Sequence, residues 1–245
     1  MNENKNRVVL SVVSHGQLHL IDALLSDLQH HMLDGFRIVL TINIPEEETV
    51  LKTYGHLPIT VIRNVTPKGF GENHNFAFGS CRSDIFVIVN PDIRIPSIAW
   101  ERLFGHFDNP KVGACAPLIL SANGAIEDSA RRFPTLSRLF MRVALRRRNS
   151  DFKIENVAHQ VDWAAGMFVA YRSSAYAKIN GFDERYFMYM EDADICRRLS
   201  RAGWSTVVTP EVSVVHDAQR ASRRSLRHLR WHVGSALRFL FLAHA

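Results

Sequence analysis

The sequence predicts an α/β fold with a Rossmann-like, mostly parallel central sheet flanked by helices. Short β-branched runs alternate with segments of helical periodicity over roughly the first 100 residues. The run Ile85–Asn90 is apolar throughout, as expected for a strand covered by helices on both faces. The 245 residues and 47% hydrophobic content favour one domain with an appendage over two full domains.

The first half is expected to contain four strands joined by helices. The strands are β-branched or apolar runs of buried-strand length, and the first helix has leucines at helical spacing. Two glycines introduce the third helix, so its segment is interpreted as a loop that enters a helix. The expected strands are Arg7–Val13, Phe36–Ile42, Ile59–Arg63 and Ile85–Asn90, and the expected helical segments are Leu18–His30, Glu46–Tyr54 and Gly69–Cys81.

The second half is mixed and ends in a helix. Its expected strands are Val112–Leu120, Val161–Tyr171 with an interruption at Gly166, Trp204–Val208 and Val212–Val215, and its expected helices are Glu191–Ala202 and Ser222–Leu242. The last helix carries an apolar stripe made of Leu226, Leu229, Val233, Ala236, Leu237 and Leu240, with Arg223, Arg227 and Arg230 beside it. We therefore divide the chain into a body, residues 1–220, and a basic amphipathic helix, residues 221–245.

The net charge of +6 comes from two arginine-rich windows. Residues 131–148 contain seven arginines and residues 220–245 contain six, with no acid in either, so the rest of the chain sums to about minus seven. The three cysteines are far apart, which argues against a disulfide framework or a zinc-thiolate site. The first residues lack an apolar signal region and no run is long enough to span a membrane, so a cytoplasmic protein is expected.

Ligands of a Rossmann-like sheet bind outside the carboxyl ends of its strands, so candidate residues are sought there. Asn90-Pro91-Asp92 follows the fourth expected strand directly, and a carboxylate in that place suits a hard divalent cation that also holds phosphate. The alternative is an ordinary turn in which Asp92 bonds to its own backbone. His216 ends the last expected strand, and it has a role in such a site only if the fold brings it to Asp92.

A second acidic cluster opens the helix that begins at Glu191. Glu191, Asp192 and Asp194 lie within four residues, behind the aromatic run 186–189. Acids at a helix N-terminus are stabilised by free backbone N–H groups, which explains one or two of them as caps. Their crowding beside aromatic rings would raise one pKa toward that of a useful general base, so capping and catalysis both stay open.

A glycine-containing loop, KGFGENHN (68–75), precedes the third expected helix. Its glycines would let the backbone approach a diphosphate, and Lys68, Asn73 and Asn75 are able to bond to phosphate or sugar hydroxyls. The first strand is not followed by Gly-x-Gly-x-x-Gly, and no Gly-Lys-Ser/Thr occurs. These absences argue against a nicotinamide or ATP enzyme.

Taken in order, these motifs resemble the inverting glycosyltransferase family 2. The likeness rests on KGFGENHN (68–75), NPD (90–92), WAAG (163–166), GFDE (181–184), FMYMEDAD (187–194) and His216, and it covers about residues 7–220. Within the family, the chain is most similar to bacterial rhamnosyltransferase-like members that build cell-surface polysaccharide. The resemblance implies a GT-A fold for residues 1–220 and a nucleotide-diphosphate sugar donor held through Mg²⁺ or Mn²⁺.

The resemblance also implies roles for single residues. The implied metal ligands are Asp92 and His216, and the implied catalytic base is Asp192. The implied donor-binding residues are Ser14, Asn43, Lys68, Gly69, Asn73, Asn90 and Asp92, and the implied acceptor-binding residues are Trp163 and Glu191. The stretch Ser14-His15-Gly16 and Asn43 depart from the family's usual residues at those places, which leaves the preferred nucleotide base open.

The implied reaction is inverting transfer of a sugar, with rhamnose from deoxythymidine-diphosphate rhamnose as the first choice, to a glycan or a polyprenyl-diphosphate-linked acceptor. A nucleotidyltransferase and an inactive sugar-nucleotide-binding homologue are the alternatives. No nucleic-acid recognition motif occurs. The arginine windows are either a solvated basic face or a surface for the inner leaflet of the membrane, with Trp231 and Phe239 taking part in lipid contact.

Overall fold

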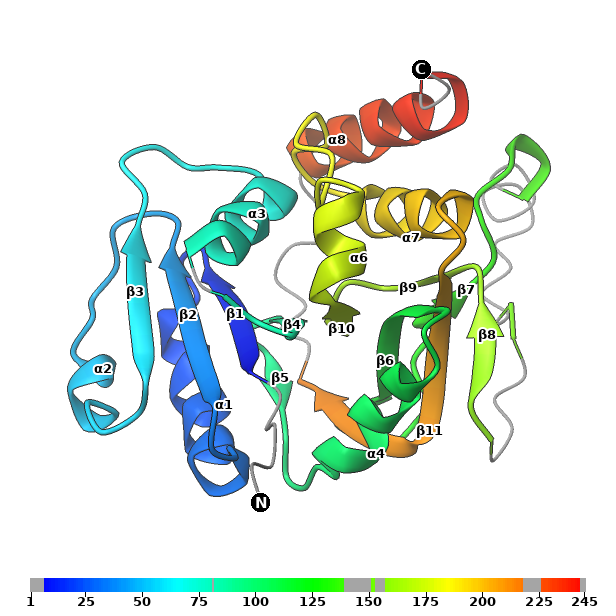
Figure 1. Ribbon diagram of the computed structural model, residues 1–245. Helices are drawn as coiled ribbons and strands as arrows, with labels where there is room; N and C mark the ends of the chain where they lie inside the picture. Colours follow the sequence, from blue (N-terminus) through cyan, green and yellow to red (C-terminus); the bar gives the residue numbers. More distant parts are fainter. Residues whose placement is uncertain (1–6, 81, 139–150, 153–156, 218–225, 243–245) are drawn as a thin grey trace.

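The computed structural model describes residues 7–80, 82–138, 151–152, 157–217 and 226–242, which form a central sheet between two layers of helices (Figure 1). The strands are β1 (Val8–Ser14), β2 (Phe36–Ile42), β3 (Ile59–Arg63), β4 (Ile85–Val89), β5 (Ile93–Arg94), β6 (Val112–Ser121), β7 (Ala130–Arg131), β8 (His159–Val161), β9 (Trp163–Ala164), β10 (Phe168–Arg172) and β11 (Ser205–His216). The helices are α1 (Leu18–His31), α2 (Val50–Thr53), α3 (Phe70–Ser80), α4 (Trp100–Gly105), η1 (His106–Asp108), α6 (Ser173–Lys178), α7 (Glu191–Arg201), α8 (Leu226–Leu237) and the π-helical turn η3 (Arg238–Leu242).

The main sheet has the order β3-β2-β1-β4-β10-β6-β11-β5, and β8 pairs with β11 beside this path. Strands β3, β2, β1 and β4 are parallel to one another, and β6 is parallel to β11. Strand β10 runs antiparallel between β4 and β6. The sheet is therefore mostly parallel, as predicted, and the carboxyl ends of β1, β2, β3 and β4 share one edge.

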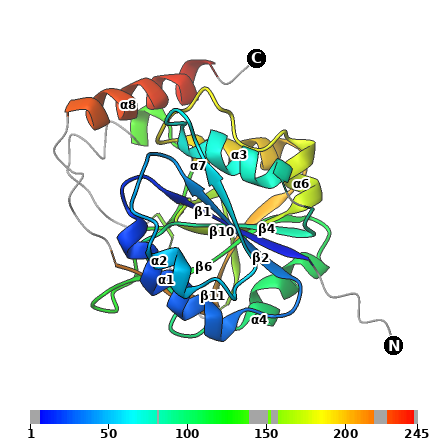
Figure 2. The same cartoon turned by 90° about the vertical axis from the view of Figure 1, so that its left-hand side faces the viewer.

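Helices cover both faces of the sheet (Figure 2). Helices α1 and α4 lie on one face and contribute Leu24, Leu28 and Trp100 to a buried cluster with β1, β2 and β4. Helices α3, α6 and α7 lie on the other face, where Tyr176 and Leu199 belong to a second cluster. Both faces of the central strands are buried, which explains their continuous apolar sequences.

The elements of the first half confirm the predicted boundaries closely. The strands β2 and β3 match the expected ranges, while α2 covers only four residues of the expected 46–54 helix. A short helix such as α2 has too few internal hydrogen bonds to extend without packing, and none of its residues is buried.

The second half divides its strands differently from the prediction, and it also contains α6 and β7, which were not predicted. The expected strands 204–208 and 212–215 form one strand, β11, whose register with β6 shifts between Thr209 and Ser213, around Pro210. The expected strand 161–171 is instead divided into β8, β9 and β10, and Gly166 lies between the last two. A proline and a glycine thus mark irregularities, but only the glycine separates two strands.

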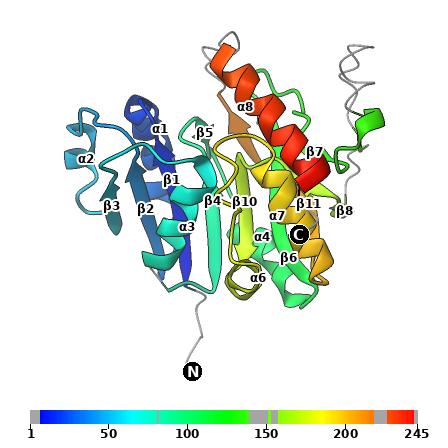
Figure 3. The same ribbon diagram turned by 90° about the horizontal axis from the view of Figure 1, so that it is seen from above.

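The C-terminal helix α8 lies over the layer that contains α7 (Figures 1 and 3). It begins at Leu226, and η3 continues it to Leu242, close to the predicted end. Residues 221–225 and 243–245 of the predicted tail, including Arg223 and Arg224, lie outside the described residues. In the first arginine window, Arg142, Arg146, Arg147 and Arg148 lie outside them as well.

Candidate active site

Asp92 and His216 are brought together by a short antiparallel pairing at the sheet edge. Strand β5 follows Asp92 directly, and its Ile93 pairs with His216 at the end of β11. The backbone N–H of Asp217 also donates to the carbonyl of Asp92 at 2.9 Å. As a result, Nε2 of His216 lies 3.2 Å from Oδ2 of Asp92, although 124 positions separate them in the sequence.

A third residue, Glu127, holds the other side of the His216 ring. Its Oε2 lies 2.9 Å from Nδ1 of His216, so the imidazole bridges two carboxylates. The hydrogen bond with Asp92, followed by that with Glu127, raises the pKa of His216 to about 9 against the opposing effect of burial. Glu127 follows the turn after β6 and has no motif around it, so it was not among the residues predicted from the sequence.

The residues present fit a divalent cation at this place. The second oxygen of Asp92, Oδ1, is buried and has no hydrogen-bond partner among the described residues, and a buried carboxylate oxygen rarely remains so. A carboxylate oxygen and an imidazole nitrogen suit Mn²⁺, and the carboxylate also suits Mg²⁺. Among the described residues, no group of three or more His, Cys, Asp or Glu side chains is arranged to hold a metal by itself.

The acids at the start of α7 have three different environments. Asp194 is 2% exposed and forms ion pairs with Arg197 at 3.2 Å and Arg198 at 2.7 Å. Asp192 instead accepts backbone hydrogen bonds from Ala193 at 2.9 Å and from Gly166 at 3.3 Å. Asp194 is therefore a structural ion-pair partner, while the Asp192 carboxylate is held by backbone N–H groups.

Burial raises the pKa of both Glu191 and Asp192. Glu191 is 6% exposed, its Oε2 has no hydrogen-bond partner within the part of the chain that the structure describes, and the neighbouring Asp192 charge raises its pKa further. Burial also raises the pKa of Asp192, against the opposing hydrogen bonds from Ala193 and Gly166 and the charge of Arg131. Raised carboxylate pKa values are typical of general bases, as the crowding in the sequence predicted.

The motif NPD (90–92) is hydrogen-bonded to the residue that follows the motif WAAG (163–166), and WAAG contacts Asp192. The N–H of Asn90 donates to the carbonyl of Met167 at 2.8 Å, one residue after the Gly166 that donates to Asp192. A Cβ at Gly166 would lie 3.6 Å from the Cβ of Asp192 and 3.5 Å from the Phe70 ring. These are ordinary van der Waals distances, so the loop lies against the first turn of α7 without requiring a glycine at position 166.

The loop Tyr186–Met190 packs on the glycine loop that precedes α3. The N–H of Phe70 donates to the carbonyl of Phe187 at 3.0 Å. A Cβ at Gly69 would lie only 2.9 Å from that carbonyl oxygen, which is closer than real side chains come to backbone. Gly69 therefore serves the close approach of two loops in this structure, and its predicted contact with the donor stays a prediction.

Three asparagine amides form the base of the glycine loop. Oδ1 of Asn43 accepts from the Lys68 N–H and from Nδ2 of Asn64, each at 2.8 Å. Nδ2 of Asn73 donates to the Gly69 carbonyl at 2.9 Å. Asn43 and Asn73 are 4% and 1% exposed and hold the loop backbone, and their predicted contact with the donor stays a prediction. Asn64, which completes the network through Oδ1 of Asn73 at 2.6 Å, was missed.

Ser14 is buried at the end of β1 and contacts a carboxylate that the sequence analysis did not select. Its hydroxyl donates to Oε1 of Glu46 at 2.7 Å, and Glu46 also accepts the N–H groups of Gly16 and Leu18. Glu46 therefore satisfies free donors at the start of α1. Ser14 lies at the expected edge, but its hydroxyl is bonded to Glu46.

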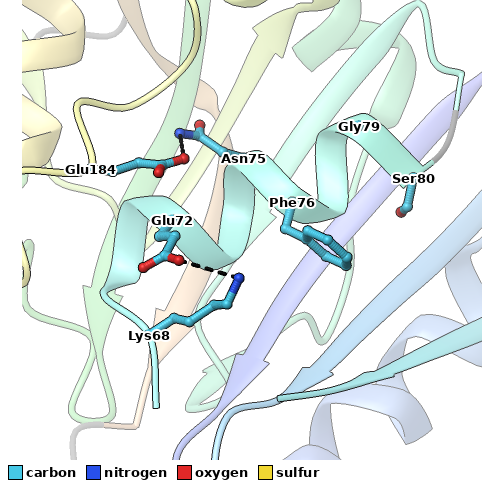
Figure 4. A pocket seen from close by; sticks show the side chains of 7 residues that line it. All are labelled: Lys68, Glu72, Asn75, Phe76, Gly79, Ser80 and Glu184. Atoms are coloured by element: carbon cyan, nitrogen blue, oxygen red, sulfur yellow. Dashed lines mark hydrogen bonds and ion pairs between the residues drawn. The ribbon is translucent and has the colours of Figure 1, made fainter. Parts of the chain in front are cut away.

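Lys68 lies at the rim of an open pocket of about 510 Å³ along α3 (Figure 4). Its Nζ forms an ion pair with Glu72 at 3.2 Å, and Asn75 on the same helix donates to Glu184 at 2.9 Å. Asp92, Asp192 and His216 do not line this pocket. We therefore place the candidate site at the sheet edge and not in the pocket.

Trp163, predicted to contact the acceptor, is 5% exposed. Its Nε1 donates to the carbonyl of Arg132 at 3.0 Å, and the Arg131 guanidinium lies 5.2 Å from its ring centre. Arg131 also pairs with Asp128 at 3.3 Å. Arg131 of the first window therefore lies against the protein, and it is close enough to lower the pKa of Asp192.

A family model described as "Glycosyltransferase like family 2" matches residues 41–234, which include most of these site residues. The chain belongs to glycosyltransferase family 2. It is 33% identical over 207 residues to the N-acetylglucosaminyl-diphospho-decaprenol L-rhamnosyltransferase of Mycobacterium tuberculosis, covering 80% of this chain and 67% of that protein. It is 29% identical over 247 residues to the rhamnosyltransferase WbbL of Escherichia coli K12, covering 95% and 92%.

Solved structures share the fold of this family 2 glycosyltransferase. GalNAc-T7 with UDP, GalNAc and Mn²⁺ superposes with a TM-score of 0.70 at 14% identity, covering 97% of this chain and 48% of that one. The mannosyltransferase PcManGT of Pyrobaculum calidifontis with GDP-Man and Mn²⁺ gives 0.64 at 18%, covering 96% and 65%. The predicted GT-A fold is confirmed, although the chain spans only about half the length of GalNAc-T7.

Proposed function

We propose that this glycosyltransferase transfers a sugar with inversion from a nucleotide-diphosphate donor to a hydroxyl of a glycan or polyprenyl-diphosphate-linked acceptor. Rhamnose from deoxythymidine-diphosphate rhamnose is the proposed donor, because both relatives named above are rhamnosyltransferases. The lipid-linked acceptor is proposed because the mycobacterial relative's name specifies a diphospho-decaprenol. The role is synthesis of cell-surface polysaccharide at the cytoplasmic side of the membrane.

The observation that carries this proposal is a short path between two carboxylates: the Gly166 N–H donates to Asp192, and the carbonyl of the next residue, Met167, accepts the N–H of Asn90, two residues before Asp92. Asp192, with its raised pKa, is the proposed base that takes the proton from the acceptor hydroxyl. Asp92 is paired with His216 at 3.2 Å and lies after β4. A single base acting on one face of the sugar gives a direct displacement with inversion, in contrast to the route with a carboxylate nucleophile.

Asp92 and His216 would hold a Mg²⁺ or Mn²⁺ ion, with Glu127 orienting the His216 ring through Nδ1. Such an ion, when bound, stabilises the negative charge of the diphosphate leaving group, so no general acid is needed. Asn90 and the backbone around Gly69 are the proposed neighbours of the donor. Trp163 and Glu191 are proposed to shape the acceptor-binding side, and both side chains are buried.

The first test replaces the proposed base. Asp192→Asn should bind nucleoside diphosphate and Mn²⁺ as the wild type does, but transfer no sugar, because the amide cannot accept the acceptor's proton. Asp108→Asn, on the exposed η1 turn, is the matched control and should keep full activity. Near-normal turnover of Asp192→Asn would remove Asp192 as the base.

The second test addresses the metal. Asp92→Ala should weaken Mn²⁺-dependent binding of deoxythymidine diphosphate in calorimetry, because it removes a carboxylate ligand. Unchanged affinity in the presence of Mn²⁺ would count against the proposed site.

We also propose that the outer face of α8 lies on an anionic membrane surface. Val233, Leu237 and Phe241 are 50%, 51% and 58% exposed, and Arg230 is exposed one turn before Val233. An exposed apolar stripe beside basic residues fits the headgroup region of anionic lipid. Within the described residues, no helix is long and apolar enough to cross a membrane.

This surface differs from the one expected from the sequence. Phe239 is only 2% exposed and packs under the Arg197 guanidinium, and the Trp231 ring lies 4.8 Å from that of Phe187. Flotation with anionic vesicles at low salt should carry the wild type, and the combined change Val233→Ser with Leu237→Ser should abolish it. A wild type that stays at the bottom of the gradient would end the membrane proposal.

A further inference from the structure

The inner face of α8 contacts the loop that leads into the candidate catalytic helix. The hydroxyl of Ser235, which is 8% exposed, donates to the backbone carbonyl of Met188 at 2.9 Å. One turn earlier, the Trp231 ring packs on Phe187 with 4.8 Å between ring centres. These two contacts lie three and four residues before Glu191.

Further contacts join α8 to this loop and join η3, which continues α8, to α7. The His232 ring lies 5.0 Å from the ring of Tyr189. Arg197, on α7 itself, donates to the carbonyl of Phe239 at 2.9 Å and lies 3.7 Å over its ring. The helix therefore holds the loop and the body of α7 at once.

The backbone of this loop is in a conformation that it does not favour by itself. Tyr189 and Met190 have φ values of 72° and 66°, in the left-handed region that residues with side chains rarely adopt. Met190 is the N-cap of α7 and makes no side-chain cap hydrogen bond. Two consecutive unfavourable residues persist only where surrounding contacts hold them.

The loop is held from the opposite side by the glycine loop of the donor site. The carbonyl of Phe187 accepts the N–H of Phe70 at 3.0 Å, and only a glycine at position 69 allows this approach. The segment 186–190 thus lies between the glycine loop and α8, and it ends one residue before Glu191.

We propose that α8 is a positioning element of the active site, in which Trp231 and Ser235 hold the strained loop 186–190 and thereby fix the first turn of α7 with Asp192. This inference rests on the proposed function, because it takes Asp192 as the base. It gives the C-terminal helix a role in catalysis that is independent of any contact between its outer face and lipid.

The test combines two variants that loosen this contact with two that do not. Ser235→Ala removes one hydroxyl, and Trp231→Ala removes the ring contact. Trp231→Phe keeps an aromatic ring against Phe187, and Ser200→Ala changes an exposed serine on α7 as the matched control. The full-length variants are compared with a soluble acceptor and without vesicles.

Two readouts are measured below the melting temperature. Ser235→Ala and Trp231→Ala should each speed hydrogen exchange in segment 186–190 and lower kcat by about fivefold, the factor expected for one intramolecular hydrogen bond. The donor KM should stay unchanged, because the donor loop keeps its own amide network. Trp231→Phe should recover most of kcat, and Ser200→Ala should match the wild type.

The outcomes separate this inference from the proposed function. Wild-type kcat and loop exchange in both loosened variants would overturn it, even if their melting temperatures fall, because α8 would then add only stability. If the wild type transfers no sugar, or if Asp192→Asn retains activity, the proposed function fails instead. The exchange measurement does not depend on activity, so it still decides whether α8 holds the loop.

Discussion

Replacing the buried His74 with glutamine should remove an acid-sensitive part of the protein's stability. His74 lies on α3 and is 1% exposed, its Nδ1 is 2.8 Å from the hydroxyl oxygen of Ser11 on β1, and its ring packs on Phe70 with 4.5 Å between centres. Burial disfavours the charged imidazolium and lowers the pKa of His74 from 6.5 to about 3.

The size and sign of the effect follow from this lowered pKa. Above pH 6.5 the imidazole is neutral in both the folded and the unfolded chain, so His74 adds no pH dependence. As the pH falls from 6.5 toward 3, only the unfolded chain gains the proton, and the free energy of unfolding falls by about 1.4 kcal/mol per pH unit. The loss is about 2 kcal/mol at pH 5 and about 4 kcal/mol near pH 3, where the folded-state imidazole is itself half protonated.

Urea denaturation of wild type and His74→Gln between pH 5 and 7.5 measures this difference. The glutamine amide keeps a hydrogen-bonding group for Ser11 but does not titrate, so the variant's stability should fall less steeply by about 1.4 kcal/mol per pH unit near pH 5. His19→Gln, at an exposed position of α1, should follow the wild-type curve. Parallel curves for wild type and His74→Gln would refute the assignment of a buried neutral imidazole.

Three further predictions concern the site itself. Glu127→Ala should weaken Mn²⁺ binding about 10- to 100-fold in an electron paramagnetic resonance titration, whereas Glu127→Gln, whose amide oxygen still accepts from His216, should stay near wild type; equal affinities in all three proteins would contradict this. Gly69→Ala should lower Tm by roughly 3–10 °C, since its Cβ would lie 2.9 Å from the Phe187 carbonyl, while Gly79→Ala on α3 meets nothing within 4 Å and should not lower it. The acid limb of kcat should lie above the usual aspartate range, because burial raises the pKa of the proposed base; a rate that stays flat down to pH 4 would argue against it.

The central strands could be predicted because their sequences have one explanation. A run such as Ile85–Val89, buried at every position, is consistent only with a strand between two helical layers. Helix α4 and strand β5 were not predicted, because two residues of strand have no periodicity and Trp100–Gly105 is shorter than two turns. These short elements matter, since β5 is what pairs with His216.

The meeting of Asp92 with His216 depends on topology that a single sequence does not contain. The residue types and the strand ends were correct guides, but only the order β6-β11-β5 puts the end of β11 beside Asp92. Glu127 has no such guide, because it lies beyond the turn that follows β6 and reaches His216 from the side. The one available signal was the predicted turn 121–124, because a carboxylate just beyond a turn at the end of a strand lies close to the sheet edge.

For the asparagines, the sequence indicated the position but not the partner of the side chain. Asn43 and Asn73 lie at the expected edge, yet their hydrogen bonds go to the loop backbone. Asparagine binds a ligand or a neighbouring loop with the same groups, and the sequence does not distinguish the two. Strand ends and motifs therefore indicated where to look, while the structure shows which neighbour each of these polar residues bonds to.

The C-terminal helix shows why its pattern predicted an amphipathic helix but not which residues would face outward. Trp231, Ser235 and Phe239 form one stripe and Val233, Leu237 and Phe241 form another, each at a spacing of four residues. Two positions along a helix correspond to a rotation of about 200°, so these stripes lie on nearly opposite faces. The first stripe is covered by the 186–190 loop and α7. A helix that is apolar on two faces is most stable when both faces are buried. The exposed second stripe is therefore what most favours a further surface, and the basic charge of the tail favours an anionic membrane as that surface.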